Sequence, residues 1–424
     1  MEARYLHRVI KAAKAARTVL GLRLSMWRFA RHGERRFRHD PRFNLENVTD
    51  GFASRIDLSN DDRNIVERIC TAYNRAVRQK KPSSDIYDGS ERWQQVREGR
   101  LAPVIRALLV HDIESLVGMF GNFYRDACSS GILGAPNGLT KAYFSGQIKD
   151  LYRRFYLSHV LYRLDYWKSQ TSGQFVIQDL AGPGVGNPFG VMIDGTHISV
   201  GAEYAHYCSE RVGELLKPGN ATLAEFGGGF GGMAYYLLRN RKRITYIDFD
   251  VPERVALTSY YLVRAYPKLR FLLYGEEELT RDAISRANVV LMPAFEMERM
   301  PAGSVNVSFS SHALSDLSWK ATAEFVKNIA RMTNDCFLYI GNKNASQIIS
   351  DMICSEHRPY KLTDTRMSGW SSFKVSGAGV GGEAGLTAST AFERCYSRLD
   401  SSESEPIATP IRTEVCAETL DALS

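Results

Sequence analysis

The sequence of 424 residues predicts an α/β fold, in which a parallel sheet follows a mainly helical N-terminal part. Between residues 44 and 170, apolar residues recur at intervals of three and four, which is typical of packed helices. Further along, helical stretches alternate with short apolar runs, and a turn rich in glycine follows the first run. These runs lie at 221–226, 243–250, 288–293, 304–311 and 336–341.

The glycine-rich turn is the strongest local signal. The stretch LAEFGGGFGG joins a buried strand to a helix start and contains Gly227, Gly228, Gly229 and Gly231. Glycine adopts positive φ and lets a ligand approach the main chain closely, at an entropic cost that an ordinary loop avoids. Free N–H groups at the start of the following helix complete a nucleotide-binding corner.

Two cofactors fit this corner. The spacing of Gly227, Gly229 and Gly232 satisfies G-x-G-x-x-G, a dinucleotide signature that is weak by itself. Glu225, with the glycines, also satisfies E-x-G-x-G-x-G, and its carboxylate suits a cationic ligand better than a pyrophosphate. S-adenosylmethionine carries a sulfonium and an ammonium group and no phosphate, so Glu225 favours it.

Acidic residues at the end of the second run supply the other half of this site. The run RITYIDFD contains Asp248 and ends at Asp250, about 20 residues after the glycines, where a carboxylate can bind ribose hydroxyls. Asp250 precedes Val251-Pro252, where the strand must stop. Both acids fit the role of ribose ligand, and the choice between them stays open.

The order of the motifs EFGGGFGG, DVPE, SYYL and ALSDL resembles that of the sugar O-methyltransferase family, over residues 180–345. Asp250-Val251-Pro252 is also similar to the D-L-P element of class I O-methyltransferases. The segment ALSDL departs at Ala313, Asp316 and Leu317, where the family tends to have Ser, Glu and Met. The resemblance implies a Rossmann-like class I methyltransferase sheet, S-adenosylmethionine as cofactor, and a sugar or glycoconjugate as acceptor.

Further site residues follow the third and fourth runs. Phe295 and Glu296 fall where such enzymes hold adenine. Phe295 is expected to stack on the base, with core packing as the alternative. Glu296 is expected to accept a hydrogen bond from the amino group of adenine, with a solvated acid as the alternative. His312, with Asp316 four residues on, lies at the crevice formed by the carboxyl ends of the strands. A histidine there suits removal of the acceptor proton. A packed ring for His312 and a helix cap for Asp316 are the structural alternatives, and Asp316 with a second carboxylate could hold a divalent metal.

The positive charge is concentrated at the N-terminus. The chain has a net charge of +7, but residues 1–43 alone carry twelve Lys/Arg and three acids, so the remainder is slightly acidic. Apolar residues recur at helical spacing within this arm, as in a basic amphipathic helix that lies on an anionic membrane surface. A transit peptide and a helix packed on its own enzyme are the alternatives. Nucleic acid is not an expected partner, because the catalytic half is not basic.

The predicted organisation has four parts: the arm (1–43), a helical domain (44–173), a catalytic domain (174–399) and a disordered tail (400–424). The helical domain is expected to bind the acceptor or to form dimer contacts. Within the catalytic domain, 174–200 is expected to be a loop, and SSFKVSG and ASTAFERCYSRL a closing antiparallel hairpin. The cysteines are odd in number and lack a C-x-x-C pair, which favours reduced thiols in the cytoplasm and argues against a zinc site.

The sequence thus predicts an S-adenosylmethionine-dependent O-methyltransferase. Its expected acceptor is a sugar or glycoconjugate, and the protein is expected in the cytoplasm, with peripheral contact at the inner face of the membrane through the arm. The alternatives are an NAD(P)-dependent oxidoreductase that uses the same glycines, and a catalytically inactive, membrane-associated scaffold.

Overall fold

The computed structural model describes residues 20–21, 23–80, 82–133, 151–356, 360–370 and 391–399. The predicted tail (400–424), the glycine-rich segment 377–385 and residues 1–19 of the arm lie outside the described residues. Ahead of residue 174 the described chain is mainly helical. Its longer helices are the N-terminal helix (residues 23–36), α2 (Glu46–Gly51), α3 (Asp62–Gln79), α4 (Glu91–Glu98), α5 (Ala102–Leu109), α6 (Ile113–Gly121) and α8 (Leu151–Gln170).

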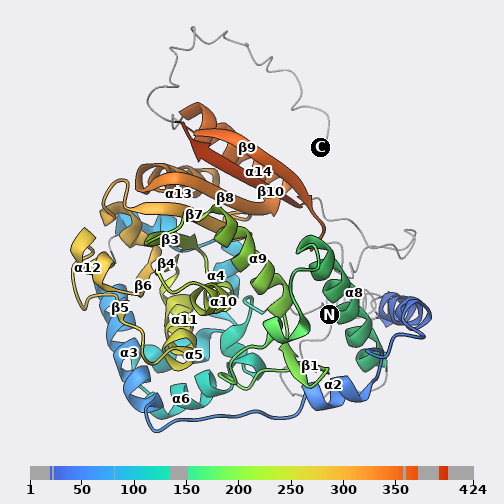
Figure 1. Cartoon of the computed structure of the whole chain (residues 1–424). Helices are drawn as coiled ribbons and strands as arrows, with labels where there is room; N and C mark the ends of the chain where they lie inside the picture. Colours follow the sequence, from blue (N-terminus) through green and yellow to red (C-terminus); the bar gives the residue numbers. More distant parts are fainter. Residues whose placement is uncertain are drawn as a thin grey trace, which may run out of the picture.

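In the described part of the chain, an eight-stranded sheet with the order β5-β6-β4-β3-β7-β8-β10-β9 forms the centre of the molecule (Figure 1). Neighbouring strands pair in parallel, except that β10 is antiparallel to both of its neighbours. The order reverses at β3, which confirms the predicted Rossmann-like α/β fold. The strands are β3 (Ala221–Phe226), β4 (Ile244–Asp250), β5 (Phe271–Leu273), β6 (Val289–Pro293), β7 (Val305–Ser311), β8 (Thr333–Asn342), β9 (Tyr360–Ser368) and β10 (Ala391–Arg398).

Both faces of this sheet are buried. Successive side chains of a strand point to opposite sides, so neighbouring residues of one strand belong to different cores. Leu223 and Tyr246 belong to the core on one face, whereas Ala224 and Ile247 belong to the core on the other. The first face is covered by α9 (Ala202–Leu215), α10 (Gly232–Asn240) and α11 (Pro252–Ala265). The second is covered by α12 (Arg281–Arg286), α13 (Trp319–Met332) and α14 (Lys343–Asp351).

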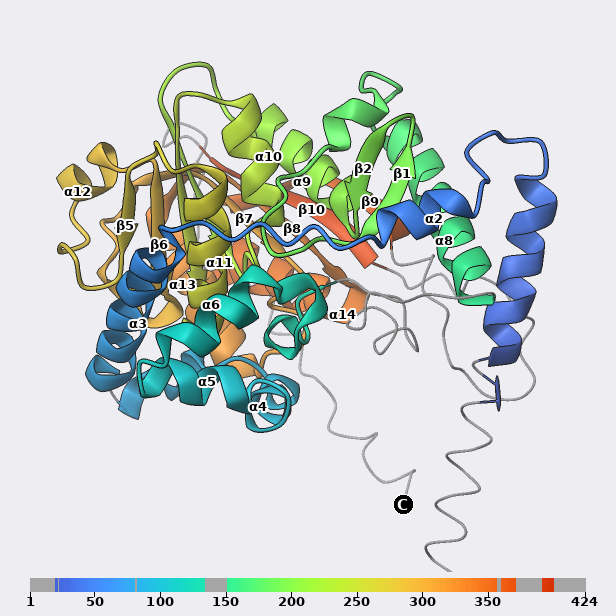
Figure 2. The same cartoon turned by 90° about the horizontal axis from the view of Figure 1, so that it is seen from below.

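The N-terminal helices form a further layer outside α11 (Figures 1 and 2). Asp62, on α3, is buried and its Oδ1 lies 2.8 Å from Nε of Arg264 on α11. Val66 and Leu108 belong to the same hydrophobic cluster as Leu223 of the sheet. The domain boundary at residues 173 and 174 stays a prediction, but one hydrophobic core crosses it.

The segment 174–200 is not the loop that we expected. It contains a hairpin of β1 (Gly190–Ile193) and β2 (Thr196–Ser199), paired antiparallel. The two residues between them, Asp194 and Gly195, have φ of 49° and 73°. Asp-Gly with positive φ at both positions is a preferred two-residue hairpin turn, and this local signal could have been recognised in the sequence.

The closing antiparallel hairpin is present, but its first strand lies upstream of the predicted one. Strand β9 ends at Ser368, whereas SSFKVSG begins at Ser371, outside the described residues. Strand β10 matches the predicted second strand, ASTAFERCYSRL, and is inserted between β8 and β9. The polar, mostly exposed sequence of β9 explains why it was not recognised as a strand, since an edge strand pairs on one side only. The prediction of a strand at SSFKVSG stays untested.

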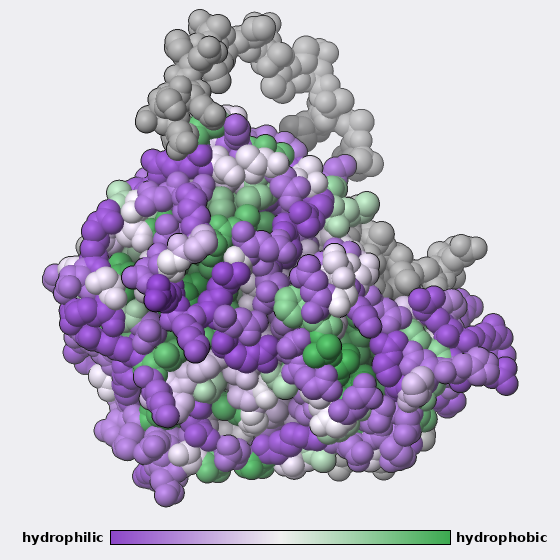
Figure 3. All heavy atoms as spheres, viewed as in Figure 1, coloured by the Kyte–Doolittle hydropathy of each residue, from purple (hydrophilic) through white to green (hydrophobic). Residues whose placement is uncertain are grey.

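The face of the molecule that Figure 3 shows is mainly hydrophilic, with apolar residues in separate patches. Among the described residues, no helix is long and apolar enough to cross a lipid bilayer. The described cysteines are all free.

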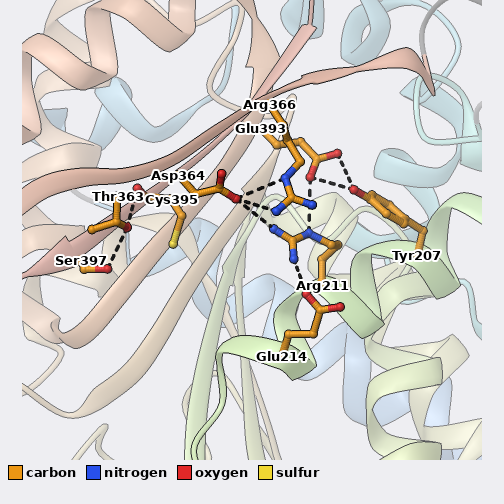
Figure 4. Close-up of polar contacts among 9 residues, drawn as sticks. All are labelled: Tyr207, Arg211, Glu214, Thr363, Asp364, Arg366, Glu393, Cys395 and Ser397. Carbon is orange, nitrogen blue, oxygen red and sulfur yellow. Dashed lines mark hydrogen bonds and ion pairs between the residues drawn. The ribbon is translucent and has the colours of Figure 1, made fainter. Parts of the chain in front are cut away.

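A buried polar network attaches the closing hairpin to α9 (Figure 4). Glu393 of β10 is 2% exposed, and the Tyr207 hydroxyl lies 2.7 and 2.8 Å from its two carboxylate oxygens. Arg211, one turn further along α9, lies between Glu393 and Asp364, at 3.6 Å from an oxygen of each. Because a buried carboxylate is costly without donors, this network fixes the hairpin on the helix.

We expect Tyr207→Phe to destabilise the fold by roughly 1–3 kcal/mol, because it leaves a buried carboxylate with fewer donors. Urea unfolding of Tyr207→Phe, Glu393→Gln and the double variant tests this. If the two side chains stabilise the fold through their mutual contact, the double variant loses less free energy of unfolding than the two single variants lose together. Strict additivity would contradict the proposed coupling.

Candidate functional site

The candidate site lies at the carboxyl ends of the parallel strands, where ligands of open α/β sheets bind. The glycine turn follows β3 and ends at the start of α10. Gly227, Gly229 and Gly231 have φ of 83°, 69° and 91°, which residues with a Cβ rarely adopt. The turn is therefore built on the positive-φ conformations that the motif predicted.

Close packing gives a second reason for glycine in this turn. A Cβ built on Gly227 would lie 2.2 Å from the Cβ of Ala313, in the loop after β7. One built on Gly228 would lie 2.8 Å from both Oδ1 of Asp248 and the Tyr246 hydroxyl. The glycines thus bring the turn against two neighbouring strand ends, and Ala313, the residue after His312, lies beside it.

Three buried carboxyl groups lie below and beside the turn. Glu225, Asp248 and Asp250 are 4%, 0% and 6% exposed. Glu225 and Asp248 are register partners on β3 and β4, so their side chains share one face of the sheet. The Tyr246 hydroxyl donates to Oε2 of Glu225 at 2.6 Å, and the Gly228 N–H donates to Oδ1 of Asp248 at 3.0 Å.

Burial makes this cluster electrostatically unfavourable. Loss of hydration raises the pKa of Glu225 to about 7, with a contribution from the charge of Asp250. Loss of hydration, with repulsion from Asp250 and Glu225, raises the pKa of Asp248 well above its ordinary value. Oδ2 of Asp248 is buried and has no hydrogen-bond partner among the described residues. The cluster therefore contains an unsatisfied polar atom. Burial favours the protonated, neutral forms of its acids in the free protein, and a bound cation would favour their ionised forms.

Asp250 differs from Asp248 in its position at the strand end. Its Oδ1 accepts from the Val251 N–H at 2.8 Å and its Oδ2 from the Gly229 N–H at 3.3 Å. Burial raises its pKa, and the guanidinium of Arg254, 3.7 Å from Oδ2, opposes this shift. The structure thus places Asp248 beneath the turn and Asp250 at its edge.

The N-terminal helices form one wall of this corner. The guanidinium of Arg254 lies over the indole of Trp93, on α4, at 3.8 Å from the ring centroid. The indole N–H of Trp93 donates to Oε1 of Glu253 at 2.9 Å. Ile132 lies 3.3 Å from a Cβ built on Gly229. Sequence reasoning missed Trp93 and Arg254, because only the fold brings α4 to Asp250.

Phe295 and Glu296 lie on a 3-10 helix (Ala294–Arg299) directly after β6, as the strand order predicted. The Phe295 ring meets Tyr274 edge to face, with centroids 5.7 Å apart. Glu296 is buried and its Oε1 lies 3.1 Å from Arg299. These contacts favour the packing alternative for Phe295 and an ion pair for Glu296. Their role in adenine binding stays a prediction.

His312 and Asp316 lie in the loop after β7, and both are exposed. His312 has φ of 61°, and its N–H donates to the Ile340 carbonyl at 2.7 Å, which fixes the start of the loop. The N-cap of α13 is Ser318, so Asp316 is not the helix cap considered from the sequence. The exposed His312 side chain is likewise not a packed core ring. Their catalytic role stays a prediction.

A pocket of about 320 Å³, lined by both polar and apolar residues, opens beside this loop. It lies between the segments that follow β7 and β8 and is lined in part by Ser315, Thr322, Asn342 and Lys343. Asn342 also caps α14 by accepting from the Ala345 N–H at 2.9 Å. The sequence analysis missed the lining residues after β8, although their position directly after a core strand is the available signal.

No group of three or more His, Cys, Asp or Glu in the described ranges is arranged to hold a metal ion. The three carboxyl groups of the corner are thus not placed as a metal centre. Among the described residues, Asp316 is likewise not joined by the further ligands that a metal site would need.

Comparison with known proteins returns likenesses of fold. No protein-family model matches the chain, and no curated protein is significantly similar in sequence. Among solved structures, magnesium protoporphyrin IX methyltransferase (ChlM) from Synechocystis PCC 6803 with bound SAM has 8% identity and a TM-score of 0.30, over 46% of this chain and 77% of that one. A SAM-dependent methyltransferase from Aquifex aeolicus has 14% identity and a TM-score of 0.28, over 45% and 88%.

The pyocyanin biosynthetic protein PhzM has 12% identity and a TM-score of 0.29, over 46% of this chain and 56% of PhzM. At these identities the likeness concerns the fold alone. The sheet itself shows the fold class: a parallel core whose order reverses at β3, closed by an antiparallel hairpin. The class of protein defined here is therefore a Rossmann-like α/β protein with a glycine-rich ligand corner, and the choice of ligand depends on the geometry of that corner.

We expect Glu225→Gln to change the pH dependence of stability. The folded chain holds a proton on Glu225 that the unfolded chain has lost between pH 4.5 and about 7, so the free energy of unfolding falls as pH rises through this window. The amide cannot ionise and keeps an acceptor for Tyr246. The variant is therefore expected to gain stability relative to the parent with rising pH, by up to roughly 3 kcal/mol.

Urea unfolding of both proteins at about pH 5 and about pH 8 measures this effect. Glu91→Gln, on an exposed position of α4, is the matched control and is expected to show no such difference. If the free energies of unfolding of Glu225→Gln and its parent differ by the same amount at both pH values, the buried carboxyl group does not titrate in this window.

Proposed function

We propose that this protein is an S-adenosylmethionine-dependent O-methyltransferase whose acceptor is a hydroxyl of a sugar or glycoconjugate. The observation that carries the cofactor assignment is the buried acidic cluster under the glycine turn, with Oδ2 of Asp248 lacking a partner among the described residues. A cationic ligand with hydroxyl donors compensates such a cluster, whereas a pyrophosphate would be repelled by it.

The residues of the corner divide between two roles. Glu225 and the glycine turn are suited to the methionine end of the cofactor, because its ammonium and sulfonium groups balance the carboxylate. Asp250, at the strand end, is suited to the ribose hydroxyls. Asp248 is fully buried and holds the Gly228 N–H, so we assign it to support of the turn. Of the two acids that the sequence left open, the proposal therefore takes Asp250 as the ribose ligand.

The loop after β7 supports a role in acceptor activation. His312 is exposed and immediately precedes Ala313, which packs against the glycine turn. When bound, S-adenosylmethionine supplies the methyl group, and the protein orients the acceptor and removes its hydroxyl proton. We assign proton removal to His312, with the imidazole accepting the proton from the acceptor oxygen.

The polar part of the pocket beside this loop supports a polyhydroxylated acceptor. Hydroxyl and amide side chains of Ser315, Thr322 and Asn342 line it, and the exposed Lys343 lies at its rim. Such groups hydrogen-bond sugar hydroxyls. The sugar itself is inferred from the resemblance of the motif order, and the pocket is compatible with that inference.

We expect Asp250→Ala to weaken binding of S-adenosylhomocysteine by about 10- to 100-fold, because it removes charge-assisted hydrogen bonds to the ribose. Calorimetric titration of the full chain with S-adenosylhomocysteine and, separately, with NADH measures this. Asp282→Ala, at an exposed position of α12, is the matched control and is expected to bind like the parent. Binding of NADH alone would overturn the methyltransferase proposal, and binding of neither would favour the inactive scaffold.

We expect His312→Ala to lower the methyl-transfer rate by about 100-fold or more and to remove the acid limb of its pH profile, because the proton acceptor is lost. Transfer of a labelled methyl group from S-adenosylmethionine to a panel of saccharides measures the rate. The affinity for S-adenosylhomocysteine is expected to stay unchanged. An unchanged rate, or an equal loss of cofactor affinity, would contradict the assigned role.

A further inference from the structure

The N-terminal helix (residues 23–36) is held on the body of the protein by one face. Met26, Ala30 and Phe37, just beyond its end, are 1%, 2% and 3% exposed. A Cβ built on Gly33 would lie 2.1 Å from Oγ of Ser158, so the glycine permits close packing on α8. This contact fixes which side of the helix faces outward, and Figure 2 shows the helix at the edge of the molecule beside α8.

The outward side combines apolar and basic residues. Leu20, Leu24 and Trp27 are 70%, 46% and 45% exposed. At helical spacing these three residues share a side with four exposed arginines. The arginines are Arg23, Arg28, Arg31 and Arg35. We call these seven residues the outer face; it contains no acid.

The other charged residues of this helix, Glu34 and Arg36, contact residues of α8. Glu34 pairs with Arg154 of α8, at 3.2 Å. Arg36 lies 3.9 Å from Asp165 and its guanidinium lies over the ring of Tyr162. The arginines of the outer face have no carboxylate partner among the described residues, although Arg31 lies over the Trp27 ring at 5.2 Å. The helix thus uses one side for folding and leaves the other for a partner.

We propose that the outer face binds an anionic lipid surface, with the helix lying in the plane of the membrane. Leucine and tryptophan enter the headgroup region while arginines at their flanks pair with lipid phosphates, the arrangement of an interfacial amphipathic helix. In Figure 3 the projecting end of this helix, at the right-hand edge, is mainly hydrophilic, as its arginines require.

Two other partners fit less well. Nucleic acid would use the arginines but not the exposed Leu20 and Leu24, whose contact with water it would not relieve. A second copy of this chain would place two uncompensated basic faces together, which is electrostatically unfavourable. Residues 1–19, which precede this helix in the sequence, contain five Lys/Arg and one acid, so the adjoining sequence is also basic. The proposal does not depend on the proposed function.

Co-sedimentation of the full chain with vesicles tests the proposal, using phosphatidylcholine mixed with phosphatidylglycerol and, separately, phosphatidylcholine alone. We expect binding to the anionic vesicles only, weakened by added salt. Replacing the four outer-face arginines by glutamine is expected to reduce the partition coefficient by on the order of 100-fold or more. The double variant Leu24→Glu/Trp27→Glu is expected to abolish binding, because it removes apolar contact and adds negative charge.

The matched control carries the same loss of four charges elsewhere, at exposed arginines replaced by glutamine. These are Arg92, Arg100, Arg281 and Arg286. The control is expected to bind vesicles like the parent. Equal weakening in both four-arginine variants would show a general effect of net charge and overturn the proposal. Absence of vesicle binding, or binding of duplex RNA in its place, would also overturn it.

Discussion

The central physical constraint in this structure is the burial of three carboxyl groups beneath and beside a glycine turn. Glu225, Asp248 and Asp250 come from two adjacent strands, and each raises the cost of ionising another. The protein offsets part of that cost with Tyr246 and the N–H groups of the turn. The remaining imbalance is centred on Oδ2 of Asp248, and the proposed cationic ligand is inferred from it.

The helical N-terminal part is a structural component of this corner. Its hydrophobic core is continuous with the core of the sheet, and Trp93 on α4 reaches the Arg254 guanidinium beside Asp250. The positive charge of the Arg254 guanidinium partly neutralises Asp250. Binding of ribose at Asp250 would therefore occur next to a cation and an aromatic ring that come from different parts of the chain.

The closing hairpin and the N-terminal helix show how local sequence can mislead. The strand β9 is polar because it forms an edge, so periodicity did not identify it, whereas Asp194-Gly195 is a turn signal that could have identified β1 and β2. The N-terminal helix belongs to the arm that the sequence predicted to be basic and amphipathic, but the sequence did not show that the apolar residues of the helix divide between two sides. Met26 and Ala30 pack inward, whereas Leu24 and Trp27 remain exposed.

By itself the sequence determined where along the chain the core strands, the glycine turn and the acids that follow it lie, because these depend on short-range patterns and on glycine geometry. The tertiary structure decided how each acid meets the turn. Asp248 and Asp250 are two residues apart on one face of β4, and the sequence already placed Asp250 at the strand end, but only the packing of the turn puts Asp248 beneath it. Likewise, Phe295 meets Tyr274, and Asn342 reaches the pocket, through contacts between distant segments that no local pattern encodes.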